Sequence, residues 1–323
     1  MIAGAGSGAL LAKADIKSAF RLIPIHPDDF CLLGIKVSDK IFVDYFESFS
    51  TFLEWVVSTR LGTGHVCHYV DDFLFRSGAS ARGSQSCPSV LNCFVDLCAV
   101  LGVPLAHDKT IEPTTKLTFL GLEINTVSQS VAIPQEKLPA INDKIETALR
   151  SAKITLKNLQ SLIGSLSFVC RAVPPGRAFL RRLIDLSKGL KKPWYSIRLS
   201  KGAKADLHIC GKFSFRINQF WLLNDDLQLF TDASSTVGFG GYFRGQWFKG
   251  VWPLSTKANK PSIAWLEFFP VVAALTLWGK QLKGKRILIR SDNAVVVSII
   301  NTQSPKCPRI MNLVRFFCPQ VPH

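Results

Sequence analysis

The chain has 323 residues, which suggests about two domains of ordinary size. With 47% hydrophobic residues, 19% charged residues and 23 Phe, it can form packed cores, so intrinsic disorder is excluded. The nine Cys contain no Cys-x-x-Cys pair, which argues against a disulfide scaffold or a zinc ribbon. The formal net charge of +16 favours a polyanionic partner, most commonly nucleic acid.

No membrane span or export signal is expected. The longest apolar stretch, residues 268–279, has 12 residues, fewer than the ~18 needed to cross a bilayer. Residues 1–11 lack the basic region of a secretion signal. We therefore expect an intracellular protein, in the nucleus or the cytoplasm, whose oligomeric state the sequence leaves open.

Acidic residues in the amino-terminal half follow strand-like segments. The apolar segment 10–16 contains Asp15, and the strand-like runs 65–69 and 73–75 flank Asp71 and Asp72 at the tip of a hairpin. Adjacent carboxylates at a turn usually mean only a solvated loop. Framed by aromatic and β-branched residues, and accompanied by a separate strand-end Asp, they are also consistent with metal ligands.

The central part of the chain is helical and basic. Residues 135–150 and 155–171 have helical patterns, and the run 177–186 is rich in Arg. Residues 151–200 hold 10 basic residues and one acidic residue, and residues 231–323 hold 12 basic and three acidic residues. Such surfaces attract phosphates, although a solvated basic face that only aids solubility is the alternative.

The three acids of the carboxyl-terminal segment are Asp232, Glu267 and Asp292. Asp232 follows the strand-like run 227–231, and Asp292 follows a strand ending at residue 290 and precedes the helical run 294–300. Residues 237–252 have the pattern of hairpin strands, and Glu267 lies near the start of an apolar helix with Ser262 as its N-cap. Acids placed in this way can meet at one sheet edge and hold two divalent ions for phosphodiester chemistry. Three isolated acids with separate local roles are the alternative.

The motifs around these acids resemble ribonuclease H. The segments Leu-Phe-Thr-Asp-Ala-Ser at 229–234, Trp-Leu-Glu at 265–267 and Arg-Ser-Asp-Asn at 290–293 are similar to its first three catalytic blocks, in the same order. The resemblance implies that Asp232, Glu267 and Asp292 are catalytic metal ligands. The chain ends without the fourth Asp of that family, so we expect an incomplete domain.

The amino-terminal acids lie in motifs that resemble reverse transcriptases. Tyr-Val-Asp-Asp at 69–72 is similar to their signature, and residues 15–20 are similar to their first palm motif. The resemblance implies that Asp15 and Asp71 hold two Mg²⁺ ions, with Mn²⁺ as a possible substitute. The backbone carbonyl of Ile16 would join them, and Asp72 would be an accessory catalytic acid.

The same resemblance implies further binding residues. Phe20 would pack under the sugar of a deoxynucleoside triphosphate, although a plain core Phe fits the sequence equally well, and Lys109 matches a basic residue of the nucleotide site. The helical region resembles a polymerase thumb, whose basic residues would contact phosphates. These residues are Arg177, Arg181, Arg182, Lys191 and Lys192. The amino-acid sequence of residues 15–30 and 49–55 is most similar to that of retrotransposons of the tyrosine-recombinase class. Long-terminal-repeat elements are the next most similar class.

The chain also departs from the reverse-transcriptase pattern. Only 14 residues precede Asp15, where family members have a fingers subdomain, and the Leu-Pro-Phe-Gly block is absent between residues 44 and 46. Asp15 and Asp71 are 56 positions apart, closer than in the family, as a deletion would produce. These gaps remove parts that grip the template and position the nucleotide, so we expect polymerase activity to be lost.

These observations predict an α/β protein with a truncated reverse-transcriptase palm and thumb, followed by an incomplete ribonuclease H-like domain with a mixed sheet. The expected regions are a palm at 1–130, a thumb-like helical region at 131–192, a linker at 193–226 and the ribonuclease H-like domain at 227–323.

The resemblance implies an enzyme, an RNA-directed DNA polymerase with ribonuclease H activity on RNA/DNA hybrids. Its partners would be an RNA template, a DNA primer, the hybrid and deoxynucleoside triphosphates. The alternatives are a non-catalytic nucleic-acid-binding remnant of a retrotransposon and a chain that does not fold stably.

Overall fold

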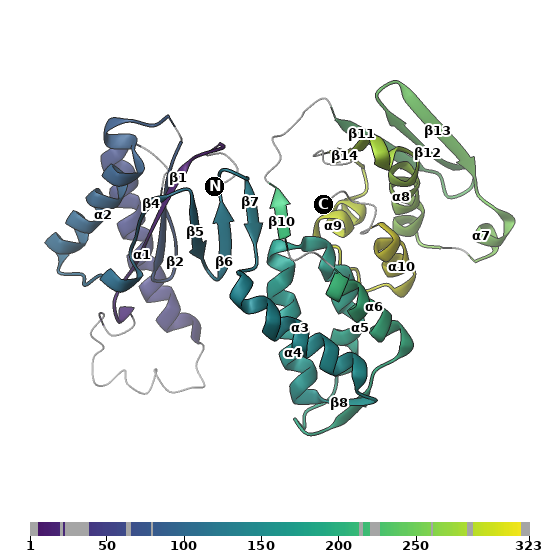
Figure 1. The fold of residues 1–323 in the computed structure, drawn as a ribbon. Coiled ribbons are helices and arrows are strands. Elements are labelled where there is room, and N and C mark those ends of the chain that lie inside the picture. Colours follow the sequence, from purple (N-terminus) through teal and green to yellow (C-terminus); the bar gives the residue numbers. More distant parts are fainter. Residues whose placement is uncertain are drawn as a thin grey trace. The chain divides into compact units, whose positions relative to one another are not determined.

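The computed structural model describes residues 6–19, 22, 39–62, 66–78, 80–212, 216–219, 227–259, 261–282 and 287–317. The chain divides into two compact units, Met1–Val131 and Ala132–His323 (Figure 1). Each unit combines helices with β-sheet, so the mixed α/β architecture expected from the sequence is confirmed.

The amino-terminal unit is built on a four-stranded sheet with the order β2-β3-β1-β4. Helices α1 and α2 pack against it, and Leu53 of α1 and Phe94 of α2 share a buried core with Phe73 and Phe75 of β3. Strands β5 and β6 form an antiparallel hairpin beside this sheet. The elements are β1 (Leu10–Asp15), α1 (Asp39–Leu61), β2 (Val66–Tyr69), β3 (Asp72–Ser77), α2 (Cys87–Leu101), β4 (Ile111–Thr114), β5 (Lys116–Phe119), β6 (Leu122–Asn125) and β7 (Ser130–Ala132).

The first half of the carboxyl-terminal unit is a helical group with a two-stranded ribbon, β8 and β9 (Figure 1). Helix α4 begins where expected, because the side chain of Thr155 accepts a hydrogen bond from the backbone N–H of Asn158. The elements are α3 (Leu138–Arg150), β8 (Lys153–Thr155), α4 (Leu156–Ala172), α5 (Arg177–Ser187), β9 (Ser196–Arg198), α6 (Lys201–Lys212) and β10 (Arg216–Gln219).

Part of the segment expected to be a linker is folded. Residues 193–226 contain β9 and α6, and α6 packs on α3 and α5. The reason is an apolar face at helical spacing: Ala203, Leu207 and Cys210 are all buried. The expected linker is therefore, in its first half, part of the helical group.

The second half of this unit contains a four-stranded sheet with the order β13-β12-β11-β14. Strand β11 pairs antiparallel with β12 and parallel with β14, which gives the mixed sheet expected from the sequence. Helix α8 packs across β11 and β12, and α10 packs on α8 (Figure 1). The elements are β11 (Gln228–Ala233), β12 (Gly238–Phe243), β13 (Gln246–Val251), α7 (Leu254–Ala258), α8 (Ile263–Leu282), β14 (Leu288–Arg290), α9 (Ala294–Thr302) and α10 (Pro308–Phe317).

Helix α8 is long and apolar enough to cross a membrane by length and composition alone. Much of its apolar surface is covered by the rest of the protein, since Phe268, Val271 and Leu275 are buried. Core helices of soluble proteins pass the same test, so this helix is weak support for a membrane span.

Candidate active site

Three carboxylates of the carboxyl-terminal unit converge at one edge of its sheet. Asp232 lies near the end of β11, Glu267 lies in the second turn of α8, and Asp292 lies between β14 and α9. One side-chain oxygen from each residue lies within 4.8 Å of the others. We call these residues the Asp232 cluster. The sequence alternative, three isolated acids in separate places, is not what the structure shows.

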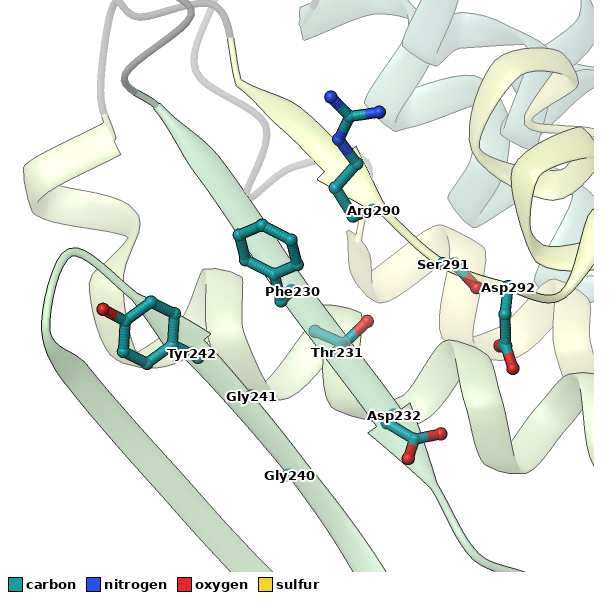
Figure 2. A pocket seen from close by; sticks show the side chains of 9 residues that line it. All are labelled: Phe230, Thr231, Asp232, Gly240, Gly241, Tyr242, Arg290, Ser291 and Asp292. Carbon is teal, nitrogen blue, oxygen red and sulfur yellow. The ribbon is translucent and has the colours of Figure 1, made fainter.

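Parallel strand pairing brings the two Asp residues together. Phe230 of β11 stands opposite Arg290 of β14, so this register, continued by two residues, places Asp232 beside Asp292. The carboxyl ends of parallel neighbours meet at the same edge of a sheet. Figure 2 shows the two Asp side chains leaving adjacent segments at the same end of a shared pocket.

Backbone groups hold both segments in place. The N–H of Ala233 donates to Oδ1 of Asp232 at 2.8 Å, which limits the rotation of that carboxylate. The side chain of Asn293 caps α9 by accepting from Val295 and Val296, and the N–H of Asn293 donates to Oγ of Ser291. Asp292 is therefore fixed between a serine turn and a helix N-cap.

Glu267 is the buried member of the cluster, with 7% of its surface exposed. Its Oε2 is buried and has no hydrogen-bond partner. Burial, followed by the negative charges of Asp232 and Asp292, raises the pKa of Glu267 above its usual range, and the backbone N–H of Ala233 opposes this. A buried carboxylate that has an oxygen without a partner and lies next to two more carboxylates is a suitable ligand for a divalent cation.

A pocket of about 660 Å³ gives solvent and ligands access to the Asp232 cluster. Asp232 and Asp292 line one end of it, and Phe230, Tyr242 and Arg290 line the part farther from these two acids (Figure 2). Phe230 and Tyr242 are directly opposite each other in the strand register and are both about half exposed.

The amino-terminal unit places its candidate acids around the β2–β3 hairpin. Asp15 ends β1 directly opposite Asp72, the first residue of β3, and Asp71 lies in the turn before it. The N–H of Ile16 donates to the carbonyl of Asp71 at 3.1 Å, which ties the end of β1 to the turn. We call Asp15, Asp71 and Asp72 the palm acids.

Two of the palm acids are paired with lysines. The Nζ of Lys109 lies 3.2 and 3.1 Å from the two oxygens of Asp15, and the Nζ of Lys13 lies 2.9 Å from Oδ1 of Asp72. Burial, aided by the negative charges of Asp15 and Asp72, raises the pKa of Asp71, whereas a backbone hydrogen bond and the charge of Lys109 act in the opposite direction. In the described part of the chain, the palm acids do not converge as a group of three in the way that the Asp232 cluster does.

Helix α1 supports the hairpin turn that carries Asp71, and the sequence did not indicate this. Val70 has a φ of 56°, which is unfavourable for a β-branched residue. Its carbonyl accepts from Oγ of Ser50 at 2.5 Å, and its N–H donates to Glu47 at 3.3 Å. Ser50 is fully buried, and together with Glu47 one turn earlier it gives this face of α1 the polar groups that hold the turn.

The expected phosphate-binding residues fall into two groups. Arg177, Lys191 and Lys192 are exposed. Arg181 pairs with Asp185, and Arg182 donates to the buried Asp206 at 2.9 Å. Phe20, expected at the sugar of the nucleotide, lies outside the described residues.

The sequence is similar to parts of retroviral polyproteins. It is 26% identical over 241 residues to the Gag-Pro-Pol polyprotein of simian retrovirus SRV-1, which covers 65% of this chain and 12% of the relative. It is 30% identical over 135 residues to the corresponding polyprotein of human T-cell leukemia virus 3 (strain 2026ND), covering 42% of this chain and 8% of the relative. The chain thus spans about an eighth or less of these curated relatives. No family model matches it.

The fold is similar to that of a foamy viral protease-reverse transcriptase. The structure of the foamy viral protease-reverse transcriptase dRH in complex with double-stranded DNA matches 96% of this chain and 55% of its own chain, with a TM-score of 0.50 and 15% identity. The mixed α/β reverse-transcriptase fold expected from the sequence is therefore confirmed. The similarity to these polyproteins supports the interpretation of this chain as a segment of a retroelement polyprotein. It gives no support to the narrower resemblance to tyrosine-recombinase elements.

Proposed function

We propose that the carboxyl-terminal unit hydrolyses the RNA strand of RNA/DNA hybrids with divalent metal ions held by the Asp232 cluster. The observation that carries this proposal is the convergence of three carboxylates from β11, α8 and the β14–α9 turn within 4.8 Å. Mg²⁺ prefers carboxylate oxygens, and Mn²⁺ can replace it at such sites. The Asp-Glu-Asp order of the motifs favours ribonuclease H chemistry over other uses of an acidic cluster.

The residues of the cluster fit a divalent ion. Two exposed carboxylates, Asp232 and Asp292, flank the buried Glu267, whose Oε2 has no other partner. A bound ion supplies an activated water and neutralises charge on the phosphate and on the leaving oxygen. The chain's own contribution is orientation: the N–H of Ala233 holds Asp232, and the cap formed by Asn293 holds the segment of Asp292.

A nucleic-acid partner is supported by charge and by the position of the pocket. The basic residues of the helical group offer phosphate contacts that do not depend on base sequence, and the exposed Arg177, Lys191 and Lys192 are the strongest candidates. The foamy viral relative was solved with double-stranded DNA, which agrees with this partner class. The hybrid substrate, the RNA template and the DNA primer are part of our proposal.

We further propose that RNA-directed DNA synthesis is lost in this chain. Metal ions at the palm would have to displace Lys109 from Asp15 and Lys13 from Asp72. Without metal ions at the palm acids, a deoxynucleoside triphosphate held by Phe20 and Lys109 would have no metal to bind its phosphates. The carbonyl of Ile16 would likewise have no metal ion to bind. The absence of the nucleotide-positioning Leu-Pro-Phe-Gly block between residues 44 and 46 also supports the loss of DNA synthesis.

One gel assay tests both parts of the proposal. The RNA strand and the DNA primer of a hybrid carry different end labels, and the reaction contains Mg²⁺ or Mn²⁺ and deoxynucleotides. Wild type, Asp71→Asn and Asp232→Asn are compared. We expect RNA shortening that is lost only in Asp232→Asn, and no primer extension in any variant.

Other outcomes have definite meanings. Primer extension that Asp71→Asn abolishes would show that the palm works and that the second part of the proposal is wrong. RNA shortening that persists in Asp232→Asn would come from another activity. Neither product, from folded protein that binds the hybrid, would support the non-catalytic remnant.

A further inference from the structure

Two large aromatic side chains, consecutive in the chain, are exposed between α5 and β9. Trp194 is 71% exposed and Tyr195 is 53% exposed. Aromatic residues of this size usually bury most of their surface in a core or an interface. Single exposed apolar residues are common, but an adjacent Trp-Tyr pair on a folded segment is a candidate binding surface.

The backbone beneath these two rings is firmly held. The N–H of Tyr195 donates to the carbonyl of Lys192 at 3.1 Å, and the carbonyl of Tyr195 accepts from Leu156 at 2.8 Å. The carbonyl of Pro193 accepts from the N–H of Lys157 at 2.9 Å. The segment is thus tied to the start of α4, and the rings are displayed from a fixed backbone, which lowers the entropic cost of binding.

The ribbon of β8 and β9 anchors the same segment. Ile154 of β8 stands opposite Ile197 of β9, and both side chains are buried. The neighbouring positions of the ribbon point outward and pair Lys153 with Arg198 across the strands. Figure 1 shows β8 at one end of the helical group.

Positive charge predominates in the part of the sequence that carries the two rings. Residues 151–200 contain a single acid, Asp185, and it is occupied by Arg181 and Lys188. Five exposed cations on the ribbon, on the adjoining loop and at the start of α4 form no ion pair among the described residues. They are Lys153, Lys157, Lys191, Lys192 and Arg198.

We propose that Trp194 and Tyr195, with these five cations, form a platform for single-stranded nucleic acid. Unpaired bases stack on the two rings, and the cations contact the phosphates between them. This combination binds any sequence, because every base has a flat face and every nucleotide has a phosphate. A duplex keeps its bases stacked inside, so it offers the rings nothing comparable. The platform does not depend on hybrid cleavage by the Asp232 cluster.

The test uses the full chain carrying Asp232→Asn, in buffer with EDTA, so that no cleavage occurs. Binding of a fluorescently labelled oligodeoxythymidylate of ~15 nucleotides, a length suited to such sites, is measured by anisotropy. We expect Trp194→Ala and Tyr195→Ala each to weaken binding about tenfold, while Trp194→Phe keeps most of the affinity. Trp55→Ala is the matched control, because Trp55 is 62% exposed on α1.

The salt dependence separates stacking from phosphate contacts. Lys191→Gln and Lys192→Gln should each lower the slope of log affinity against log salt by about 0.7, whereas Trp194→Ala should leave it unchanged. Equal binding by Trp194→Ala, Trp55→Ala and the parent would overturn the proposal. So would a blunt duplex that competes as well as the single strand. Thermal unfolding of each variant confirms that it is folded, and hybrid cleavage by the Trp194→Ala chain with Asp232 intact reports on the nuclease separately.

Discussion

Asp15 and Asp232 occupy similar local positions, since each lies at the end of a strand with buried neighbours. Their surroundings differ in the source of positive charge. Asp15 receives it from Lys109 of its own chain, whereas the Asp232 cluster has no lysine or arginine ion pair among the described residues. An acid paired within the chain is satisfied without a ligand, while a cluster of three unpaired acids repels itself until a cation binds. Similar strand-end acids can therefore differ in their need for a ligand: Asp15 is neutralised within the chain, whereas the Asp232 cluster needs a cation from solution.

The largest expected effect is on hybrid cleavage. Asp232→Asn removes a metal ligand and should lower the rate of cleavage at least ~100-fold. Removal of a group that only hydrogen-bonds to a metal ligand already lowers activity by up to about 100-fold, and the ligand itself should matter more. Asp71→Asn should leave the rate within about twofold, since the palm acids take no part. Cleavage rates are measured with a labelled RNA strand at saturating Mg²⁺.

The control for this pair is Asp143→Asn, because Asp143 is exposed on α3 and distant in sequence from either cluster. It corrects for the loss of one negative charge from a basic protein. A similar loss of cleavage in Asp71→Asn and Asp232→Asn would remove the distinction between the two regions.

The second expected effect is on metal binding itself. Titration calorimetry with Mn²⁺ should detect a site that weakens at least ~10-fold in Asp232→Asn and is unchanged in Asp71→Asn. The reason is that Mn²⁺ at the palm must compete with Lys109 and Lys13, whereas no such cation occupies the Asp232 cluster. A site that disappears in Asp71→Asn instead would show that the palm acids bind metal despite their lysines.

A smaller effect should appear in the stability of the amino-terminal unit. Lys109→Met leaves the buried Asp15 without its partner and should lower the unfolding temperature by a few degrees. Hydrogen bonding to Asp15 raises the pKa of Lys109, so this stabilisation is complete at neutral pH and is lost only as pH rises through the raised lysine pKa. Lys17→Met, at an exposed site of the same unit, is the control and should change little.

Local patterns predicted much of the fold and the candidate site. Buried strand residues followed by an acid indicated β1 and β11, and Ser262 was expected to cap the helix that carries Glu267. The structure agrees, since Oγ of Ser262 accepts from the N–H of Trp265 at 3.4 Å. These features depend on a few neighbouring residues, so the sequence alone contains their physical cause.

Pairings between distant residues could not be predicted in this way. Lys109 contacts Asp15 across 94 positions, and Arg182 contacts Asp206 across 24. Charge counts identify both cations but give no partner, so Arg182 was expected to contact phosphates. Helix α6 was missed for a different reason, because its short apolar face lies in a basic, linker-like stretch. Tertiary packing decides both cases.

The smallest expected effect is on stability. The stability difference between Glu267→Gln and wild type should change sign when a divalent metal ion is added. Its pKa is raised by burial and by the two Asp residues, so between the ordinary Glu pKa and the raised value the folded chain binds more protons than the unfolded chain. Wild-type stability therefore falls as pH rises through that window. Without metal at neutral pH, Glu267→Gln should be more stable than wild type, because the amide carries no charge to be buried or repelled by the two Asp residues. Each kcal/mol gained should raise the unfolding temperature by about 2–4 °C.

This advantage should shrink as pH falls toward the ordinary Glu pKa, and it should reverse when Mg²⁺ is added, because the ion binds and stabilises only the intact cluster. Differential scanning fluorimetry with EDTA or Mg²⁺ across pH measures both changes. Glu136→Gln, at an exposed site before α3, is the control. If Glu267→Gln is less stable than wild type in EDTA, then Glu267 is held by contacts within the protein, as Asp15 is, and the contrast between the two regions fails at the residue on which it depends most.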